Sequence, residues 1–129
     1  MIKEIINVAG KFIENIKPLT LASKSTYRLI KEIGCLDSSI QINEIDVYNE
    51  LLKCPECIMQ WVEASGNQKD GDSWHFGANT NGKYWVSRLA NENENRSYQQ
   101  TIYTDGNKAC ANFITHLIEY YKELYQEGV

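Results

Sequence analysis

The sequence predicts an α+β domain with N-terminal helices, a four-stranded antiparallel meander and a C-terminal helix packed on the sheet. Apolar residues recur at helical spacing near both ends of the chain, and from residue 58 the pattern changes to alternation. Polar stretches and an Asn-Gly pair separate the alternating segments. The 129 residues can bury one hydrophobic core, so we expect a single domain over residues 1–129.

Helices are predicted at the start of the chain. The segment 2–16 carries an apolar stripe, and it ends before Pro18 because a proline disfavours the α conformation in the preceding residue. A second helix over residues 26–33 begins after Ser25, a favourable N-cap, and ends at Gly34. Its side chains expected to face the core are Tyr27, Ile30 and Ile33.

A third helix is predicted over residues 44–53. Asn43 is its N-cap, and Pro55 prevents its continuation because proline lacks the N–H group that a helix interior uses. The side chains expected to face the core are Ile45, Tyr48, Leu51 and Leu52, with Glu44 and Glu50 pointing outward.

Strands are predicted in the second half. Residues 58–65 alternate between two faces, as a half-buried strand does, and a polar turn follows them. The pair Asn81-Gly82 predicts a hairpin, and the polar run 91–95 predicts a loop. The expected strands of the meander are 58–65, 73–76, 83–89 and 98–104.

The last predicted helix packs on one face of the sheet. Asp105 is its N-cap, because a carboxylate there accepts hydrogen bonds from the free N–H groups of the first turn. Its apolar stripe consists of Ala109, Cys110, Phe113, Ile114, Leu117, Ile118, Tyr121 and Leu124.

Composition and charge exclude several classes of protein. Hydrophobic residues make up 43% of the chain and the net charge is −4, which excludes intrinsic disorder. No apolar run approaches the length of a membrane span, and Lys3, Glu4 and Asn7 interrupt any signal-peptide core, so we expect a cytoplasmic protein without membrane contact. Residues 37–72 carry a net charge of −6, which favours a basic partner and disfavours nucleic acid.

The four cysteines are expected to be reduced thiols, as is usual in the cytosol. Cys35 and Cys110 have apolar neighbours and are expected to be buried. Cys54 and Cys57 form a Cys-x-x-Cys pair, but a redox pair of the thioredoxin type lies at a helix start after a strand, and here the predicted order is the reverse. A zinc site needs four ligands, and no second close pair is present. We interpret both as structural residues and expect no metal and no cofactor.

Other catalytic patterns are weaker. The segment 77–83 matches the first positions of a phosphate-binding loop, but Tyr84 replaces the required Ser or Thr and a strand follows in place of a helix. His75 and His116 are expected to be structural, since nucleophilic catalysis needs three groups within reach of one another. Aromatic residues could stack on single-stranded nucleic acid, but few basic side chains accompany them. We expect no enzymatic activity.

One pattern of aromatic and small residues covers about half of the chain, residues 57–118. Trp61–Ser65 ends a predicted strand, Trp74 opens the next one after a polar turn, and Ala109–Ile114 lies in the closing helix. In this pattern the chain resembles the immunity proteins of bacterial contact-dependent growth inhibition and related polymorphic-toxin systems.

The resemblance implies a stoichiometric inhibitor that binds and neutralises a cognate toxin. We expect a monomer or small homo-oligomer. Toxin domains of this kind are often nucleases with basic clefts, which carboxylates can match. A non-catalytic regulatory or adaptor domain of a mobile element or phage is the alternative. The residues expected to contact the toxin are Asp46, Glu50, Glu63, Asp70 and Asp72, with Trp85 as an aromatic anchor.

Overall fold

The computed structural model describes residues 1–16, 24–67, 73–92 and 95–128. Its α+β class, antiparallel sheet and C-terminal helix confirm the sequence prediction, but the sheet of the described residues has three strands and not four. In chain order the elements are α1 (Ile2–Ile6), α2 (Val8–Ile16), α3 (Thr26–Ile33), α4 (Glu44–Leu52), α5 (Pro55–Gly66), β1 (Trp74–Ala78), β2 (Tyr84–Glu92), β3 (Asn95–Tyr103) and α6 (Gly106–Gln126).

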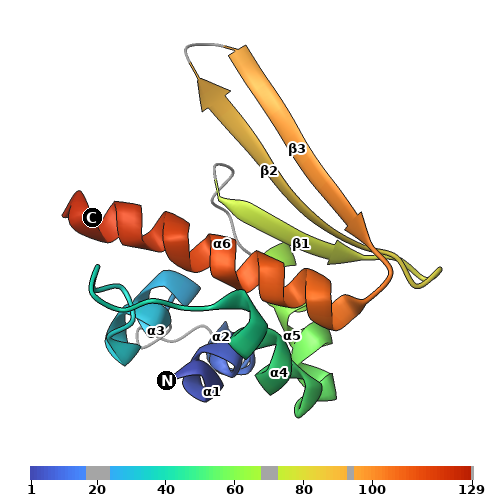
Figure 1. Ribbon diagram of the computed structural model, residues 1–129, viewed down its shortest axis with the longest axis horizontal. Helices are drawn as coiled ribbons and strands as arrows, with labels where there is room; N and C mark the ends of the chain where they lie inside the picture. Colours follow the sequence, from blue (N-terminus) through green and yellow to red (C-terminus); the bar gives the residue numbers. More distant parts are fainter. Residues whose placement is uncertain (17–23, 68–72, 93–94, 129) are drawn as a thin grey trace.

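Helix α6 crosses one face of the sheet, and the N-terminal helices lie on the side of α6 that faces away from the sheet (Figure 1). Trp61 of α5 is 1% exposed and packs edge-on against Phe113 of α6, with ring centroids 5.8 Å apart. Its indole Nε1–H donates to the carbonyl of Ile6 at 3.0 Å. Phe113 also stacks on Phe76 of β1 at 5.5 Å. The core is therefore continuous from α1 through α5 and α6 to the sheet.

The three strands pair in the order β1-β2-β3. In the β1–β2 ladder Gly77 lies opposite Trp85, and in the β2–β3 ladder Trp85 lies opposite Ile102. Phe76 and Val86, which are a cross-strand pair on the other face, are both buried. Phe76 stacks on Phe113 of α6, so the face of β1 and β2 that carries this pair packs against α6. Gly77 and Trp85 point to the opposite side, because successive residues of a strand alternate between the two faces.

The predicted hairpin between β1 and β2 is confirmed. The side-chain oxygen of Asn79 accepts hydrogen bonds from the N–H groups of Asn81 at 2.9 Å and Lys83 at 3.1 Å, and Gly82 has a φ of 75°. The loop predicted at 91–95 is wrong at residues 91, 92 and 95, which belong to β2 and β3, and residues 93 and 94 lie outside the described residues. Polar sequence does not prevent backbone pairing.

Residues 58–65, predicted as a strand, lie within helix α5. Pro55 is in the first turn, where its missing N–H group is not needed, and Cys54 precedes it as the N-cap. A strand would divide the apolar residues of this segment between two faces, whereas a helix gathers them on one side. The buried residues of α5 are Cys57, Ile58, Trp61, Ala64 and Ser65.

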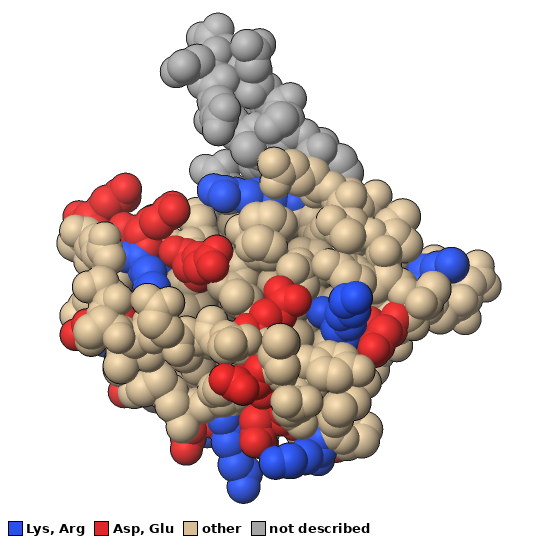
Figure 2. Space-filling model, in the orientation of Figure 1, with Lys and Arg blue, Asp and Glu red and all other residues tan. Residues whose placement is uncertain are grey.

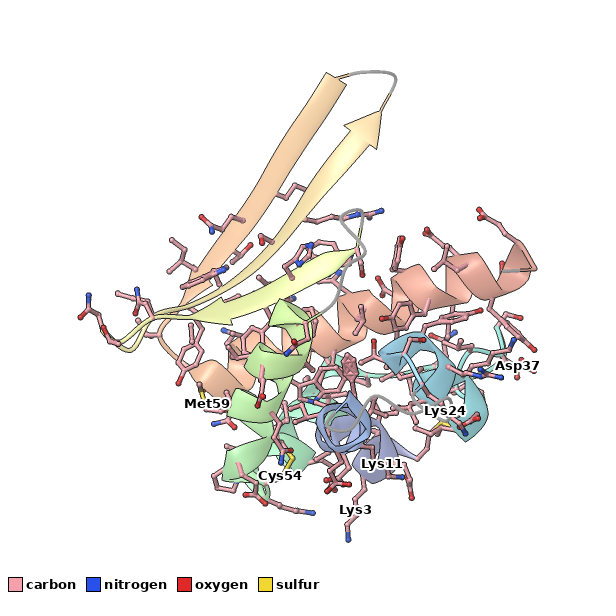
Figure 3. All side chains as sticks on the ribbon, turned by 180° about the vertical axis from the view of Figure 1, so that it is seen from behind. Lys3, Lys11, Lys24, Asp37, Cys54 and Met59 are labelled. Carbon is pink, nitrogen blue, oxygen red and sulfur yellow. A yellow bond between two sulfur atoms is a disulfide. The ribbon has the colours of Figure 1, made fainter. Side chains whose placement is uncertain are left out.

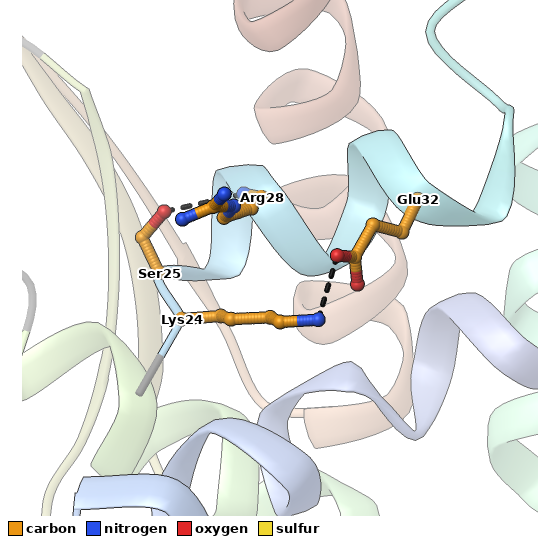
Figure 4. A network of polar contacts seen from close by, with 4 residues as sticks. All are labelled: Lys24, Ser25, Arg28 and Glu32. Carbon is orange, nitrogen blue, oxygen red and sulfur yellow. Dashed lines mark hydrogen bonds and ion pairs between the residues drawn. The ribbon is translucent and has the colours of Figure 1, made fainter. Parts of the chain in front are cut away.

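Helix α3 confirms its predicted bounds. The Ser25 side chain accepts a hydrogen bond from the Arg28 N–H at 3.2 Å (Figure 4). Gly34 follows the helix with a left-handed φ of 89°. An exposed ion pair joins Lys24 to Glu32 at 2.7 Å across the same helix. The local signals at both ends of α3 were therefore sufficient to place it.

The predicted first helix is divided in two at Asn7. The Asn7 amide donates to the carbonyl of Lys3 at 2.7 Å, so the side chain satisfies a backbone group at the end of α1. The apolar stripe continues through both helices, and Ile5, Ile6 and Val8 are buried.

The cysteines have two different states. Cys35 and Cys110 are free and buried as predicted, and burial raises the pKa of both thiols. The prediction that Cys54 and Cys57 are free thiols is wrong, because their sulfur atoms are bonded to each other. The prediction that a strand follows the pair is wrong as well, because helix α5 begins at Pro55.

Candidate functional site

Large apolar side chains are exposed where α4, α5 and α6 meet. Ile45 and Leu52 of α4 are 68% and 51% exposed, and Met59 of α5 is 57% exposed. Figure 3 labels Met59 on α5. The segment Asp105–Lys108 at the start of α6 lines one cavity with Ile45 and another with Leu52 and Met59. We name this surface, formed by Ile45, Tyr48, Leu52, Met59 and Asp105–Lys108, the α4–α6 face.

The prediction that Ile45 and Leu52 face the core is wrong. The side chains of α4 that face the core are Val47 and Leu51, which are one turn apart and 0% exposed. Ile45 and Leu52 are seven residues apart and therefore share the neighbouring side of α4. Asn43 caps the helix as predicted, by accepting from the Ile45 N–H at 2.9 Å.

The larger cavity of the α4–α6 face has a volume of about 400 Å³. Its wall combines apolar and charged groups, with two carboxylates and one ammonium group. The residues that line it are Glu44, Ile45, Tyr48, Asp105, Lys108 and Ala111.

Asp105 is held in place from both sides. One carboxylate oxygen accepts from the N–H groups of Asn107 at 3.0 Å and Lys108 at 3.4 Å, which confirms the predicted N-cap of α6. The other oxygen accepts the phenol hydrogen of Tyr48 at 3.1 Å. The hydrogen bond to Asp105 and its negative charge raise the pKa of Tyr48.

Glu44 is held in a similar way. Its carboxylate accepts a hydrogen bond from the side-chain amide of Asn112 on α6 at 3.0 Å. Burial, and then the charge of Glu44, raise the pKa of Tyr103 at the end of β3. The two carboxylates of this cavity are thus fixed by partners on the opposite elements.

The Tyr48–Asp105 bond predicts a loss of stability at high pH. Because the folded state raises the pKa of Tyr48, the bond contributes fully below the ordinary tyrosine pKa of about 10 and is lost as pH rises through the folded value. Tyr48→Phe should therefore lower the urea midpoint at neutral pH and change it less and less above about pH 10. Tyr125→Phe, on an exposed side chain of α6, is the matched control. An equal effect of Tyr48→Phe at all pH values contradicts the assignment.

The smaller cavity of the α4–α6 face has a volume of about 210 Å³. Leu52 and Met59 line it together with Tyr84 of β2. A methyl group at Gly106 would lie 2.7 Å from the Tyr84 ring, so the glycine allows the start of α6 to approach β2.

The acidic residues predicted to contact a partner do not all lie together. Asp46 and Glu50 are one turn apart on α4, about 100–140° around the helix from Ile45. Glu50 pairs with Lys53 at 3.2 Å. Glu63 is exposed on α5. Two further residues of the predicted set, Asp70 and Asp72, lie outside the described residues.

Trp85, the predicted aromatic anchor, lies on the face of β2 that points away from Val86 and α6. It is half-buried because its ring covers the backbone of Gly77. Its neighbour across the ladder, Ile102, is 63% exposed. Trp85 is therefore separated by the sheet from the α4–α6 face.

The histidine on α6 is part of the packing. His116 stacks on Trp74 at 4.1 Å with an interplanar angle of 12°, and its Nδ1 is 3.8 Å from Glu119. Arg88 lies over the rings of Trp74 and Tyr120. Across the described ranges, no group of three or more His, Cys, Asp or Glu side chains converges as metal ligands do.

Charge is spread over more of the surface than the sequence indicated. Figure 2 shows acidic side chains interspersed with lysines and arginines, with one acidic group gathered toward the C-terminal end of α6. Glu119, Glu123 and Glu127 are exposed there at intervals of four residues. The α4–α6 face differs from this region because it combines fixed carboxylates with exposed apolar groups.

The signals for the α4–α6 face were present but divided in the sequence. Asp105 was recognised only as a helix cap, and Ile45 and Leu52 only as core residues. No match was found when the chain was compared with protein-family models, with curated proteins and with solved structures. Among the described helices, none combines the length and the hydropathy that crossing a membrane requires.

Proposed function

We propose that the chain is an immunity protein, which binds and neutralises a cognate toxin domain with a basic cleft, a nuclease, through the α4–α6 face. The observation that carries this proposal is the exposure of Ile45, Leu52 and Met59 beside the fixed carboxylates of Glu44 and Asp105. A group of exposed apolar side chains with a polar rim is typical of protein-binding surfaces.

The fixed carboxylates favour a basic partner. Asn112 holds Glu44 and Tyr48 holds Asp105, so neither carboxylate has to lose much side-chain freedom when a lysine or arginine approaches. A nuclease cleft carries such cations because it binds phosphates. Charge would then direct encounter and orientation, while Ile45 and its apolar neighbours would supply the buried anchors. Inhibition by occupation of the cleft requires no bond-making by this chain.

Ile45→Ala is expected to raise the Kd for the toxin encoded beside this chain at least about tenfold, or about 1.4 kcal/mol, because Ile45 is a buried anchor in the complex. Ile102→Ala is the matched control, since Ile102 is exposed to a similar degree, 63% against 68%, on β3. Calorimetry or biolayer interferometry gives both values. Glu44→Gln should slow association at low salt and have less effect at high salt.

Co-expression tests the function itself. Cells that produce the toxin should survive with the wild-type chain, and a complex of the two proteins should co-purify. Failure of the chain to protect these cells rules out the immunity function. An unchanged Kd for Ile45→Ala, with a raised Kd for Asp46→Lys or Glu50→Lys, keeps the function but assigns it to the acidic side of α4.

A further inference from the structure

The Cys54–Cys57 disulfide closes the first turn of a helix. The two sulfur atoms are 2.12 Å apart, and the Cα atoms are 5.5 Å apart. Cys54 is the N-cap of α5, Pro55 is its first residue and Cys57 lies within the first turn. A Cys-x-x-Cys pair at a helix N-terminus is the setting in which thiol chemistry is favoured, because N–H groups and the helix dipole stabilise a thiolate.

The two sulfurs differ in access. Cys54 is half-buried, whereas Cys57 is 0% exposed and belongs to the core. An incoming thiolate can therefore reach Cys54 only, and Cys57 becomes the leaving group. The other cysteines, Cys35 and Cys110, are buried and their thiol pKa values are raised, so neither competes.

The buried sulfur has a polar neighbour. Cys57 Sγ lies 3.9 Å from the side-chain oxygen of Asn7, at the break between α1 and α2. The amide nitrogen of Asn7 donates to Lys3, which leaves that oxygen directed at the sulfur. A Cys57 thiol formed by reduction would therefore have an acceptor in an otherwise apolar place.

A cavity of about 500 Å³ opens beside Cys54. Its charged groups are of both signs: Lys3, Lys53, Glu50 and Glu56 line it, and Lys53 is paired with Glu50 at 3.2 Å. Cys54 lies at the start of α5, with the labelled Lys3 on the neighbouring helix (Figure 3). This volume and this mixture of charges suit a small peptide that carries carboxylate and ammonium groups.

We propose that Cys54–Cys57 is a thiol–disulfide exchange site for a small charged thiol peptide of the glutathione class. A peptide thiolate attacks Cys54 Sγ; the Cys54–Cys57 bond breaks, a mixed disulfide forms on Cys54, and Cys57 leaves as a thiolate that takes a proton from solvent. A second thiolate attacks the peptide sulfur and releases Cys54. Two thiols are oxidised to one disulfide, and the protein disulfide is reduced to two thiols.

This inference goes beyond the proposed function, and its test needs no toxin. The reduced full-length chain is mixed with glutathione disulfide, quenched with acid, alkylated and mapped by mass spectrometry. Cys57→Ser should accumulate the mixed disulfide on Cys54, because no second thiol displaces the peptide. Cys54→Ser should react at least about tenfold more slowly at Cys57, because that sulfur is buried.

A separate experiment tests whether Lys3 recognises the charges of the peptide. When it is introduced into the Cys57→Ser variant, Lys3→Gln should slow the reaction with glutathione disulfide. It should not slow the reaction with the uncharged disulfide of 2-mercaptoethanol. Lys11→Gln, on an exposed lysine of α2 that does not line this cavity, is the matched control.

Two results overturn the proposal. One is equal reactivity of the two single-cysteine variants, as a generally accessible pair would give. The other is the absence of a mixed disulfide on Cys54 of the Cys57→Ser variant, when the circular dichroism of that variant matches that of the wild type. Equal slowing of both disulfides by Lys3→Gln contradicts the choice of a charged peptide.

Discussion

Trp61→Ala is expected to lower the free energy of unfolding by about 3–5 kcal/mol. Trp61 is 1% exposed and lies where α5, α6 and α1 meet, so its removal leaves a cavity that no neighbour can fill without moving a helix. The carbonyl of Ile6 would also lose the hydrogen bond from the indole. Urea denaturation followed by circular dichroism measures the change.

Met59→Ala, on the same helix, is the control for Trp61→Ala. Met59 is 57% exposed, and its replacement should change stability by less than about 0.5 kcal/mol. Trp61→Phe keeps a ring against Phe113 and should be less destabilising than alanine. A loss below about 1 kcal/mol for Trp61→Ala would mean that α5 does not pack as the structure has it.

Gly77→Ala should destabilise the protein by about 1–3 kcal/mol. A β-carbon at Gly77 would lie 2.3 Å from the ring of Trp85, so the ring would have to leave the strand that it covers. The measurement is the urea midpoint together with the tryptophan emission maximum, which should move to longer wavelength as Trp85 becomes exposed.

The double variant with Trp85→Ala tests the cause. Without the ring there is no clash, so Gly77→Ala should have little further effect in the Trp85→Ala background. Gly66→Ala is the control, because its added β-carbon would meet no atom within 4 Å beyond its chain neighbours and the backbone of its own helix. Additive effects of Gly77→Ala and Trp85→Ala would show that the backbone of Gly77, and not its contact with the ring, is what alanine disturbs.

Helix ends were predictable because their causes are local. Ser25, Asn43 and Asp105 each accept hydrogen bonds from N–H groups two or three residues further along, and Gly34 takes a left-handed conformation that other residues avoid. The hairpin at Gly82 follows for the same reason. Such interactions involve residues that are close in the chain, so they can be predicted from the sequence alone.

Segment 58–65 was not predicted correctly, because we interpreted its short alternation as a strand and did not weigh the helix that gathers its apolar residues on one side. Pro55 supplied the missing signal: we interpreted it as the end of one helix, and it is also the start of the next. That error carried over to Cys54 and Cys57, whose redox interpretation was set aside because a strand was expected after them. The position of a cysteine pair on its element decides its chemistry.

The sequence alone determined the α+β class, the caps, the β1–β2 hairpin and the apolar stripe of α6, since each depends on residue type and short-range spacing. Only the tertiary structure decided which side of α4 is buried. Val47 and Leu51 face the core, while Ile45 and Leu52 face solvent beside Asp105, because α6 packs against one side of a helix that is apolar on two. Burial depends on residues distant in the chain, and no local pattern records where they lie.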